Sequence, residues 1–187
     1  IMEMINCLDS DALIDQDGRK EIIKKIAGID EEIYIDVLTG AYNRKYYEEN
    51  IKMTTRVSGI AMLDLDDFKL YNDTFGHMAG DVALKTVVSV IKKEIRKTDL
   101  IIRYGGDEFL IVMPGIEENT FVKKIKHIRE TIDNTKVPGY PKLKLSVSIG
   151  GVISGGQPIE KAVEKADKLM YKAKIKKNMV VTENEKN

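Results

Sequence analysis

The chain has 187 residues, of which 43% are hydrophobic, so it is long and apolar enough to form one domain with an adequate core. Its 30 basic and 30 acidic residues cancel. This balance argues against a global positive field for nucleic acid or membranes, so any phosphate affinity must be local. The lone Cys7 excludes an intrachain disulfide framework, and the sequence contains no secretory signal and no apolar run of transmembrane length.

Residues 1–35 are predicted to be a helical lead-in or linker. A short capped amphipathic helix is indicated by Asp17, Gly18, Ile22, Ile23, Ile26 and Gly28. A calcium loop around Asp15 is rejected, because Leu13 and Lys24 stand where that loop needs acids. Since the chain begins at Ile1 rather than Met, we expect it to be cut from a longer protein.

The apolar run at residues 58–63 is predicted to be a buried strand, and acids follow it at once. A buried strand that ends in acids places them at a crevice. Because side chains alternate along a strand, Asp64 and Asp66 share one face, while Leu65 turns its side chain away and offers its carbonyl oxygen. Magnesium prefers such oxygen ligands and usually shares itself with a phosphate.

The rest of the chain alternates between helical and strand patterns. The spacing of apolar residues predicts helices over 80–97, 118–133 and 158–175, and strands over 143–149 and 179–181. Residues 101–113 read as a β-hairpin. From residue 58 the order is strand, helix, strand, strand, helix, strand, which is the ferredoxin-like βαββαβ pattern of an α/β (α+β) domain.

The turn of this hairpin combines two glycines, Gly105 and Gly106, with two acids, Asp107 and Glu108. Glycine lets backbone N–H groups approach a ligand closely. Adjacent acids repel each other unless a cation offsets their charge. The same residues also suit an ordinary exposed turn, but the second acidic site at 64–67 favours a bound divalent metal.

Four blocks, in order, resemble the GGDEF domain of diguanylate cyclases. They are residues 36–40 with Asn43 and Arg44, residues 64–81, residues 96–109 and residues 166–174. The resemblance implies a GGDEF domain over 36–182, followed by a polar tail at 183–187. It also implies the nucleotidyl cyclase/polymerase palm fold, in which the helix over 158–175 and the closing strand extend the ferredoxin-like core.

The resemblance further implies an enzyme that condenses two GTP molecules into cyclic di-GMP with release of pyrophosphate, across a homodimer of half-sites. Asp64, Asp107 and the Leu65 carbonyl would hold two Mg²⁺ (or Mn²⁺) ions per active half-site. Asp107 would also accept the proton of the attacking hydroxyl, and Glu108 would have a supporting, orienting role.

Substrate binding is implied for a wider set of residues. They are Phe68, Lys69, Asn72, His77, Asp81, Gly105, Gly106, Lys174 and Lys177. Backbone N–H groups near Phe68 and Lys69 would meet the phosphates, while Asn72 and Asp81 would read the guanine edge. For His77 the simpler alternative is a histidine that caps a turn.

Arg96 and Asp99 match the R-x-x-D spacing of the family's product-inhibition site. An arginine fork binds phosphate and stacks on guanine, while the acid accepts hydrogen bonds from the guanine edge. The alternative is a helix C-terminal arginine paired with a nearby acid.

The sequence departs from the family pattern after Lys174. The family normally has two residues, then Gly, then Arg or Lys, then Asn, whereas here Ile175, Lys176, Lys177 and Asn178 follow. Lys174 keeps its place as a phosphate contact, and the second cation is either Lys177 or Lys176.

The competing function is a catalytically silent GGDEF module that binds GTP or cyclic di-GMP and signals to a partner; the intact acids at Asp64, Asp107 and Glu108 argue against it. We expect a bacterial cytoplasmic location, with no nucleic-acid partner. An upstream sensory part, outside this chain, would control dimerisation and could tether the protein to a membrane.

Overall fold

The computed structural model describes residues 32–183. The compact unit that holds the features below starts at Ile35. The helix predicted between Asp17 and Gly28, together with Cys7 and tail residues 184–187, lies outside the described residues. Within residues 32–183, no helix combines the length and apolar character that crossing a bilayer requires.

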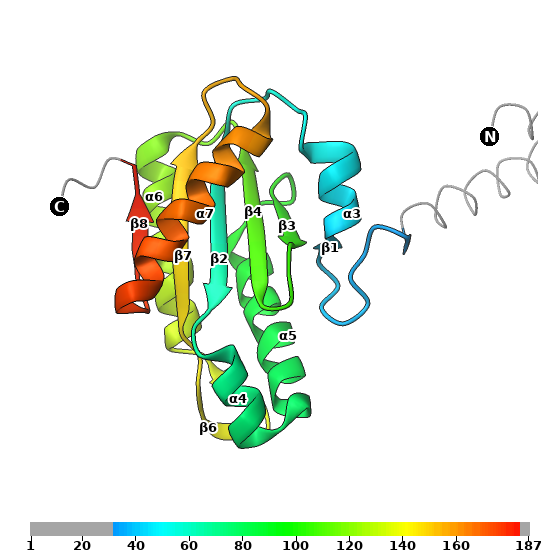
Figure 1. Ribbon diagram of the computed structural model, residues 1–187, viewed down its shortest axis with the longest axis vertical. Helices are drawn as coiled ribbons and strands as arrows, with labels where there is room; N and C mark the ends of the chain where they lie inside the picture. The colour runs from blue at the N-terminus through cyan, green and yellow to red at the C-terminus, as the bar shows by residue number, and fades with distance from the viewer. Residues whose placement is uncertain (1–31, 184–187) are drawn as a thin grey trace, which may run out of the picture. The chain divides into compact units, whose positions relative to one another are not determined.

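Six strands form one sheet in the order β1-β3-β4-β2-β7-β8 (Figure 1). Their bounds are β1 Tyr42–Asn43, β2 Ser58–Leu65, β3 Leu100–Arg103, β4 Glu108–Pro114, β7 Val147–Ile153 and β8 Val180–Thr182. The central strand β2 is buried along its whole length and runs antiparallel to both β4 and β7. Parallel pairing of β1 with β3 and of β8 with β7 extends the sheet at both edges.

Helices cover both faces of this sheet (Figure 1). On one face lie α5 (His77–Glu94) and α6 (Glu118–Asp133), whose core cluster includes Ala61 and Leu63 of β2. The other face carries α7 (Ile159–Lys176), the short helix α3 (Arg44–Tyr46) and the π-helical segment η2 (Tyr47–Ile51), with Ile60 and Met62 of β2 beneath. The order β2-α5-β3-β4-α6-β7 confirms the predicted ferredoxin-like core.

One helix that the sequence did not predict, α4 (Phe68–Phe75), follows β2 directly. It begins after Asp67, whose φ of 56° turns the chain sharply at the end of the strand. Phe68, Tyr71 and Phe75 pack against the core cluster but none is fully buried, and a helix of eight residues is too short to show a long periodic pattern in the sequence. The Tyr71 hydroxyl donates to the Lys144 carbonyl at 2.7 Å and fastens α4 to the neighbouring hairpin.

The strand predicted over 143–149 is wrong in one respect, because it is two strands. β6 (Tyr140–Lys144) pairs with β5 (Lys136–Val137) in a separate two-stranded sheet, and β7 starts only at Val147. The alternating pattern continues across the break because Leu143, Leu145 and Val147 all face the same core cluster. The helix predicted over 80–97 also shifts to 77–94, since the backbone at Ile95 is extended.

Helix α7 packs on β7 with almost no space between the two backbones at Gly150. A Cβ atom there would lie 2.0 Å from the Ala166 carbonyl oxygen and 2.2 Å from the Met170 nitrogen. Both atoms belong to the backbone of α7, which cannot move aside as a flexible side chain would. The absence of a side chain at this glycine therefore sets the height of α7 above the sheet.

We predict that Gly150→Ala lowers the free energy of unfolding by about 2–3 kcal/mol, because α7 must move away from the sheet. Urea denaturation of both proteins measures this change. Gly155→Ala is the matched control, since a Cβ there meets nothing within 4 Å. Equal losses in the two variants would contradict the close packing at Gly150.

Candidate active site

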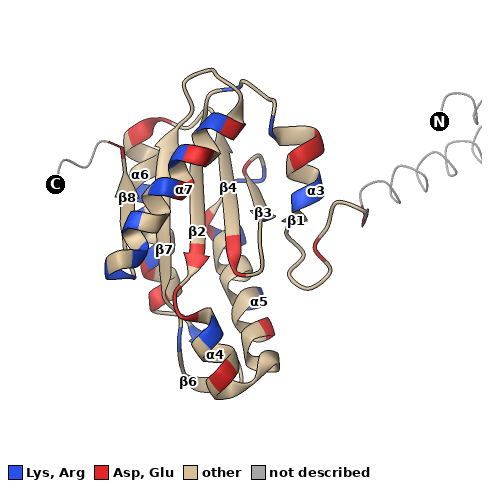
Figure 2. Cartoon of the chain, in the orientation of Figure 1, with Lys and Arg blue, Asp and Glu red and all other residues tan. Residues whose placement is uncertain are grey.

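The acidic residues that the sequence singled out gather where β2 ends and β4 begins (Figure 2). Asp64 is the last residue but one of β2, and in the sheet register it lies between Glu108 of β4 and Ser148 of β7. The Leu65 N–H donates to the Asp107 carbonyl at 3.2 Å, which joins the hairpin turn to the end of β2. The structure thus brings Asp64, Leu65, Asp107 and Glu108 together at one edge of the sheet.

Asp64 is buried, with an exposed fraction of 3%. Its Oδ2 pairs with Lys174 Nζ of α7 at 2.8 Å, whereas its Oδ1 is buried and has no hydrogen-bond partner among the described residues. The pKa of Asp64 is raised to about 6, chiefly by burial; the hydrogen bond from Lys174 opposes this rise, and the charge of Asp107 contributes to it. A buried carboxylate with a free oxygen and a raised pKa is a site that a cation would satisfy.

The hairpin turn that carries Asp107 is held tightly. The N–H groups of Tyr104 and Gly105 both donate to the Glu108 carbonyl, at 2.9 and 3.2 Å. A Cβ on Gly105 would lie 2.4 Å from Glu108 Oε2, so the glycine leaves room for that carboxylate. Gly106 is open to solvent, and a Cβ there would meet nothing within 4 Å.

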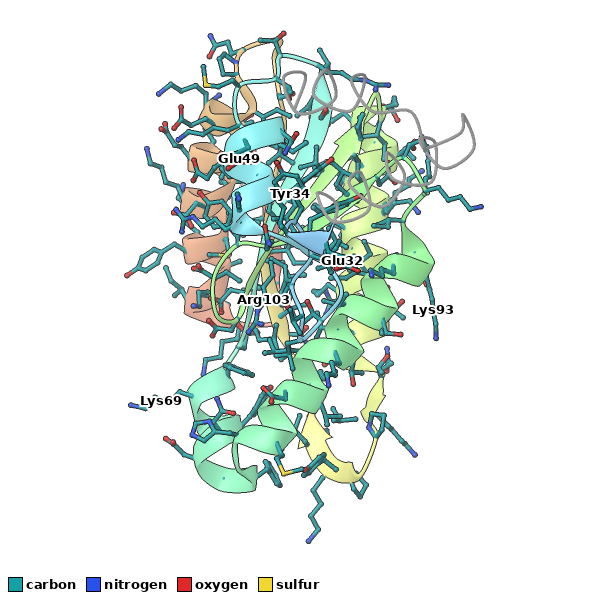
Figure 3. The ribbon with its side chains drawn as sticks, turned by 90° about the vertical axis from the view of Figure 1, so that its right-hand side faces the viewer. Glu32, Tyr34, Glu49, Lys69, Lys93 and Arg103 are labelled. Atoms are coloured by element: carbon teal, nitrogen blue, oxygen red, sulfur yellow. The ribbon has the colours of Figure 1, made fainter. Side chains whose placement is uncertain are left out.

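Arg103 is a residue to which the sequence reasoning gave no role. Its Nε and Nη2 donate to the Gly106 carbonyl at 3.1 and 2.7 Å, and its Nη1 lies 3.2 Å from both carboxylate oxygens of Asp36. Figure 3 shows its position beside the hairpin turn, where β3 ends. Arg103 thereby ties the hairpin turn to the chain segment at 36–41.

Hydrogen bonds within its own turn hold the Asp36 carboxylate in place for this contact. The N–H and hydroxyl groups of Thr39 donate to its Oδ1 at 2.9 and 2.6 Å. Although burial raises the pKa of Asp36, the bonds from Thr39 and the charge of Arg103 lower it below its usual value. The carboxylate is therefore held in its charged form for Arg103. The only signal in the sequence was the match of residues 36–40 to the family pattern.

The predicted guanine-reading residues lie on α4 and α5, which lie below the end of β2 in the view of Figure 1. Asn72 sits against the start of α5, because a Cβ on Gly80 would lie 2.0 Å from its Oδ1. Asp81 follows Gly80 and is exposed, as is His77 at the first position of α5. Asn72 therefore lies close to the helical turn that carries Asp81.

The two residues expected to meet the phosphates through their N–H groups open α4. Phe68 is half-buried and packs against the core cluster, whereas Lys69 is exposed and projects outward (Figure 3). Lys177 Nζ pairs with both carboxylate oxygens of Asp67, at 2.7 and 2.8 Å, just before this helix. Of the two lysines left open by the sequence, Lys177 is thus the one held beside α4.

The R-x-x-D pair lies in a different part of the domain. Asp99 is buried, and its Oδ2 accepts the Arg96 backbone N–H at 2.8 Å, so the acid closes the turn after α5 rather than pairing with the guanidinium group. Both residues line a cleft of about 400 Å³ together with Lys92, Lys97 and residues of the 35–42 segment. The cleft thus combines three basic side chains with the edge of one carboxylate.

The side chains at the acidic edge could bind a metal ion only together with ligands from outside the chain's side chains. Within residues 32–183 no three His, Cys, Asp or Glu side chains are grouped so that they could hold an ion by themselves. Asp64 Oδ1 is the one buried side-chain oxygen in that range with no partner. A divalent ion at this edge would therefore combine carboxylate oxygens with the Leu65 carbonyl and with oxygens of a bound phosphate.

The fold and this acidic edge define a palm-type nucleotidyl cyclase domain. The chain belongs to the GGDEF family: the model of the family described as diguanylate cyclase, GGDEF domain, matches residues 33–179. The chain is 34% identical over 153 residues to diguanylate cyclase DosC of Escherichia coli K12, which covers 76% of this chain and 33% of DosC. It therefore spans about a third of that relative.

Solved structures show the same arrangement. The GGDEF domain of DgcB from Caulobacter crescentus, in complex with c-di-GMP, is 27% identical with a TM-score of 0.73, covering 80% of this chain and 95% of that one. Diguanylate cyclase SiaD from Pseudomonas aeruginosa, in complex with its activator SiaC, is 26% identical with a TM-score of 0.80, covering 97% of this chain and 74% of that one.

We predict that Asp64 makes the metal-free protein less stable as the pH rises from about 4 to about 6. Because its folded-state pKa is raised to about 6, the folded protein holds this proton more tightly than the unfolded chain. Ionisation above that pH therefore costs up to about 3 kcal/mol, and the cost disappears at lower pH. Urea denaturation in EDTA at pH 4.5, 5.5 and 7.5 measures it.

In Asp64→Asn this part of the pH dependence should be absent. The matched control is Asp133→Asn, which changes an exposed acid at the end of α6 and should keep the wild-type dependence. If the free energy of unfolding depends on pH in the same way in Asp64→Asn and in the wild type, ionisation of the Asp64 carboxylate does not destabilise the folded protein.

Proposed function

We propose that this chain is the catalytic domain of a diguanylate cyclase, which condenses two GTP molecules into cyclic di-GMP and releases two pyrophosphates. Membership of the GGDEF family, the name of the relative DosC and the c-di-GMP complex of the DgcB domain support this activity. The observation that carries the proposal is the buried, half-paired Asp64 carboxylate beside the turn of Asp107.

Asp64, Asp107 and the Leu65 carbonyl would hold two divalent ions, Mg²⁺ or Mn²⁺, in each active half-site. A divalent ion bound there neutralises triphosphate charge and favours ionisation of the attacking hydroxyl. Lys174 already delivers a positive charge to Asp64. With the metals and GTP in place, its ammonium group would turn to the phosphates, since 41% of its side chain is exposed at this edge.

In each of the two steps, the 3′-oxygen of one GTP forms a bond to the α-phosphorus of the other, while the bond from that phosphorus to the pyrophosphate breaks. The hydroxyl proton passes to Asp107. Glu108, whose carboxylate packs against Gly105, orients the turn that holds Asp107. Because one domain presents one GTP, two copies must face each other as a homodimer.

Specificity for GTP would come from the α4 and α5 segment. The N1 and N2 groups of guanine donate hydrogen bonds, which Asp81 and the Asn72 carbonyl would accept, whereas adenine offers no matching pair of donors. His77 would contact the substrate from the first turn of α5. Backbone N–H groups at Phe68, Lys69, Gly105 and Gly106 would hold the phosphates, together with the ammonium groups of Lys174 and Lys177.

We predict that the purified chain forms cyclic di-GMP from GTP in the presence of Mg²⁺, and that its rate per protomer rises with protein concentration. Asp107→Asn should lower turnover about 100-fold or more, because it removes the proton acceptor and one metal ligand. Chromatographic analysis of the nucleotides measures both results, with Asp133→Asn as the control. A chain that binds GTP but makes no product at high concentration would be the silent signalling module instead.

We also propose that cyclic di-GMP inhibits the enzyme by binding at Arg96 and Asp99. Within residues 32–183 the guanidinium group of Arg96 has no partner and is exposed in a cleft with Lys92 and Lys97. This group would form a two-pronged contact with a phosphate, and the Asp99 oxygen that does not close the turn would accept from guanine. Binding there would hold two domains apart and keep their GTP molecules from meeting.

We predict that Arg96→Ala weakens cyclic di-GMP binding about tenfold or more, as expected for the loss of a charged hydrogen-bond donor, and leaves the initial rate of catalysis near that of the wild type. Calorimetry measures the affinity. Lys93→Ala is the matched control, because this exposed lysine of α5 does not line the cleft. Unchanged affinity in Arg96→Ala would leave the pair with only its structural role in the turn.

A further inference from the structure

Asp66 is a buried carboxylate at the end of β2 that neither the predicted metal site nor the predicted substrate contacts use. Only 2% of its surface is exposed, and both of its carboxylate oxygens accept hydrogen bonds. Its Oδ2 accepts the Ser146 hydroxyl at 2.5 Å and the Asn178 backbone N–H at 2.9 Å, and its Oδ1 accepts the Ser148 hydroxyl at 2.7 Å. One side chain thus joins the end of β2, the start of β7 and the chain that leaves α7.

The backbone where α7 ends is strained. Lys177 and Asn178 have φ values of 56° and 49°, a left-handed conformation that residues other than glycine adopt at a cost. Two consecutive residues in this conformation persist only if the surroundings hold them. In the described chain they are held on three sides: by Asp66 at the Asn178 N–H, by Arg129 Nη1 at the Asn178 Oδ1, 2.9 Å away, and by Asp67 at the Lys177 ammonium.

The strained turn follows directly on the residues of α7 that face the acidic edge. Lys174, in the last turn of the helix, pairs with Asp64, and Lys177 pairs with Asp67. Asp66 lies between these two acids in sequence, directly after β2, and its Oδ1 accepts the hydroxyl of Ser148, the residue that pairs with Asp64 in the sheet register. The carboxylate that holds the exit of α7 is therefore on the same strand end that the two lysines reach.

We infer that Asp66 is a positioning residue, which fastens the exit of α7 so that Lys174 and Lys177 reach the triphosphate of the bound nucleotide. It acts through these lysines and does not touch the substrate itself. The identity of the ligand rests on the proposed function, whereas the fastening of α7 does not. The serines keep the carboxylate pointed at Asn178, because each hydroxyl fixes one of its oxygens.

The first test is amide hydrogen exchange in Asp66→Asn, which keeps the size of the side chain but removes its charge and one acceptor. We expect exchange at Asn178 and in the last turn of α7 to become at least tenfold faster, while the buried residues of α6 keep wild-type rates. If exchange at Asn178 is unchanged, the inference is overturned. Ser146→Ala, which removes one hydroxyl and leaves the carboxylate, should give a smaller acceleration at the same amides and decides the matter if Asp66→Asn does not fold.

The second test is a double-mutant cycle on the binding of a non-hydrolysable GTP analogue with Mg²⁺, measured by calorimetry. Asp66→Asn should weaken binding five- to tenfold in the wild-type background and less than twofold in a Lys174→Ala, Lys177→Ala background, because the residues through which Asp66 acts are then gone. Equal losses in both backgrounds would show a merely structural role and overturn the inference. If the wild type binds no nucleotide at all, the proposed function fails, and the exchange experiment still decides whether Asp66 fastens α7.

Discussion

A carboxylate buried at the end of the central strand, with one oxygen that has no partner among residues 32–183, is the constraint on which the arrangement of this domain depends. Asp64 lies on the central strand β2, which is paired with β4 and with β7, and its side chain is buried. A charge held there is unfavourable unless positive charge approaches it. Lys174 reaches the Asp64 carboxylate from α7. The negative charges of Asp107 and Glu108 in the hairpin raise the pKa of Asp64, so they make a cation beside it more favourable. The helix and the hairpin must therefore both be placed accurately against β2.

Three kinds of interaction supply that placement. Steric contact at Gly150 sets the height of α7 above the sheet. A charged pair between Arg103 and Asp36, with hydrogen bonds to Gly106, holds the hairpin. Hydrogen bonds to Asp66 hold the exit of α7. Each of these interactions holds a different segment in place. The side chains at the acidic edge are therefore positioned by the surrounding fold rather than by contacts with one another.

The electrostatics of the domain are local, in keeping with a chain of zero formal net charge. Acids concentrate where β2 ends and β4 begins, and the lysines of α7 face them. A separate cleft near the end of α5 gathers Lys92, Arg96 and Lys97. Two regions of concentrated charge thus arise from different elements, and both are small enough to coexist with balanced charge elsewhere.

The sequence by itself determined the order of strands and helices in the ferredoxin-like core, and the two acidic sites. Patterns of period 2 and 3.6 depend only on neighbouring residues, which is why the helix at 118–133 was predicted with the bounds that the structure has. The acids after residues 58–63 and in the hairpin turn stood out for the same reason. Whether these acids bind metal stays a prediction.

Only the tertiary structure decided the features that depend on residues far apart in the chain. Helix α4 escaped prediction because its eight residues are too few to show a long periodic pattern, and the break between β6 and β7 was hidden because its flanking residues face one core. The partner of Lys177 is 110 residues away, and Asp66 bonds to groups 80 and 112 residues away. Contacts over such separations leave no periodic trace in the sequence, since they arise only when the sheet brings the ends of β2, β7 and α7 together.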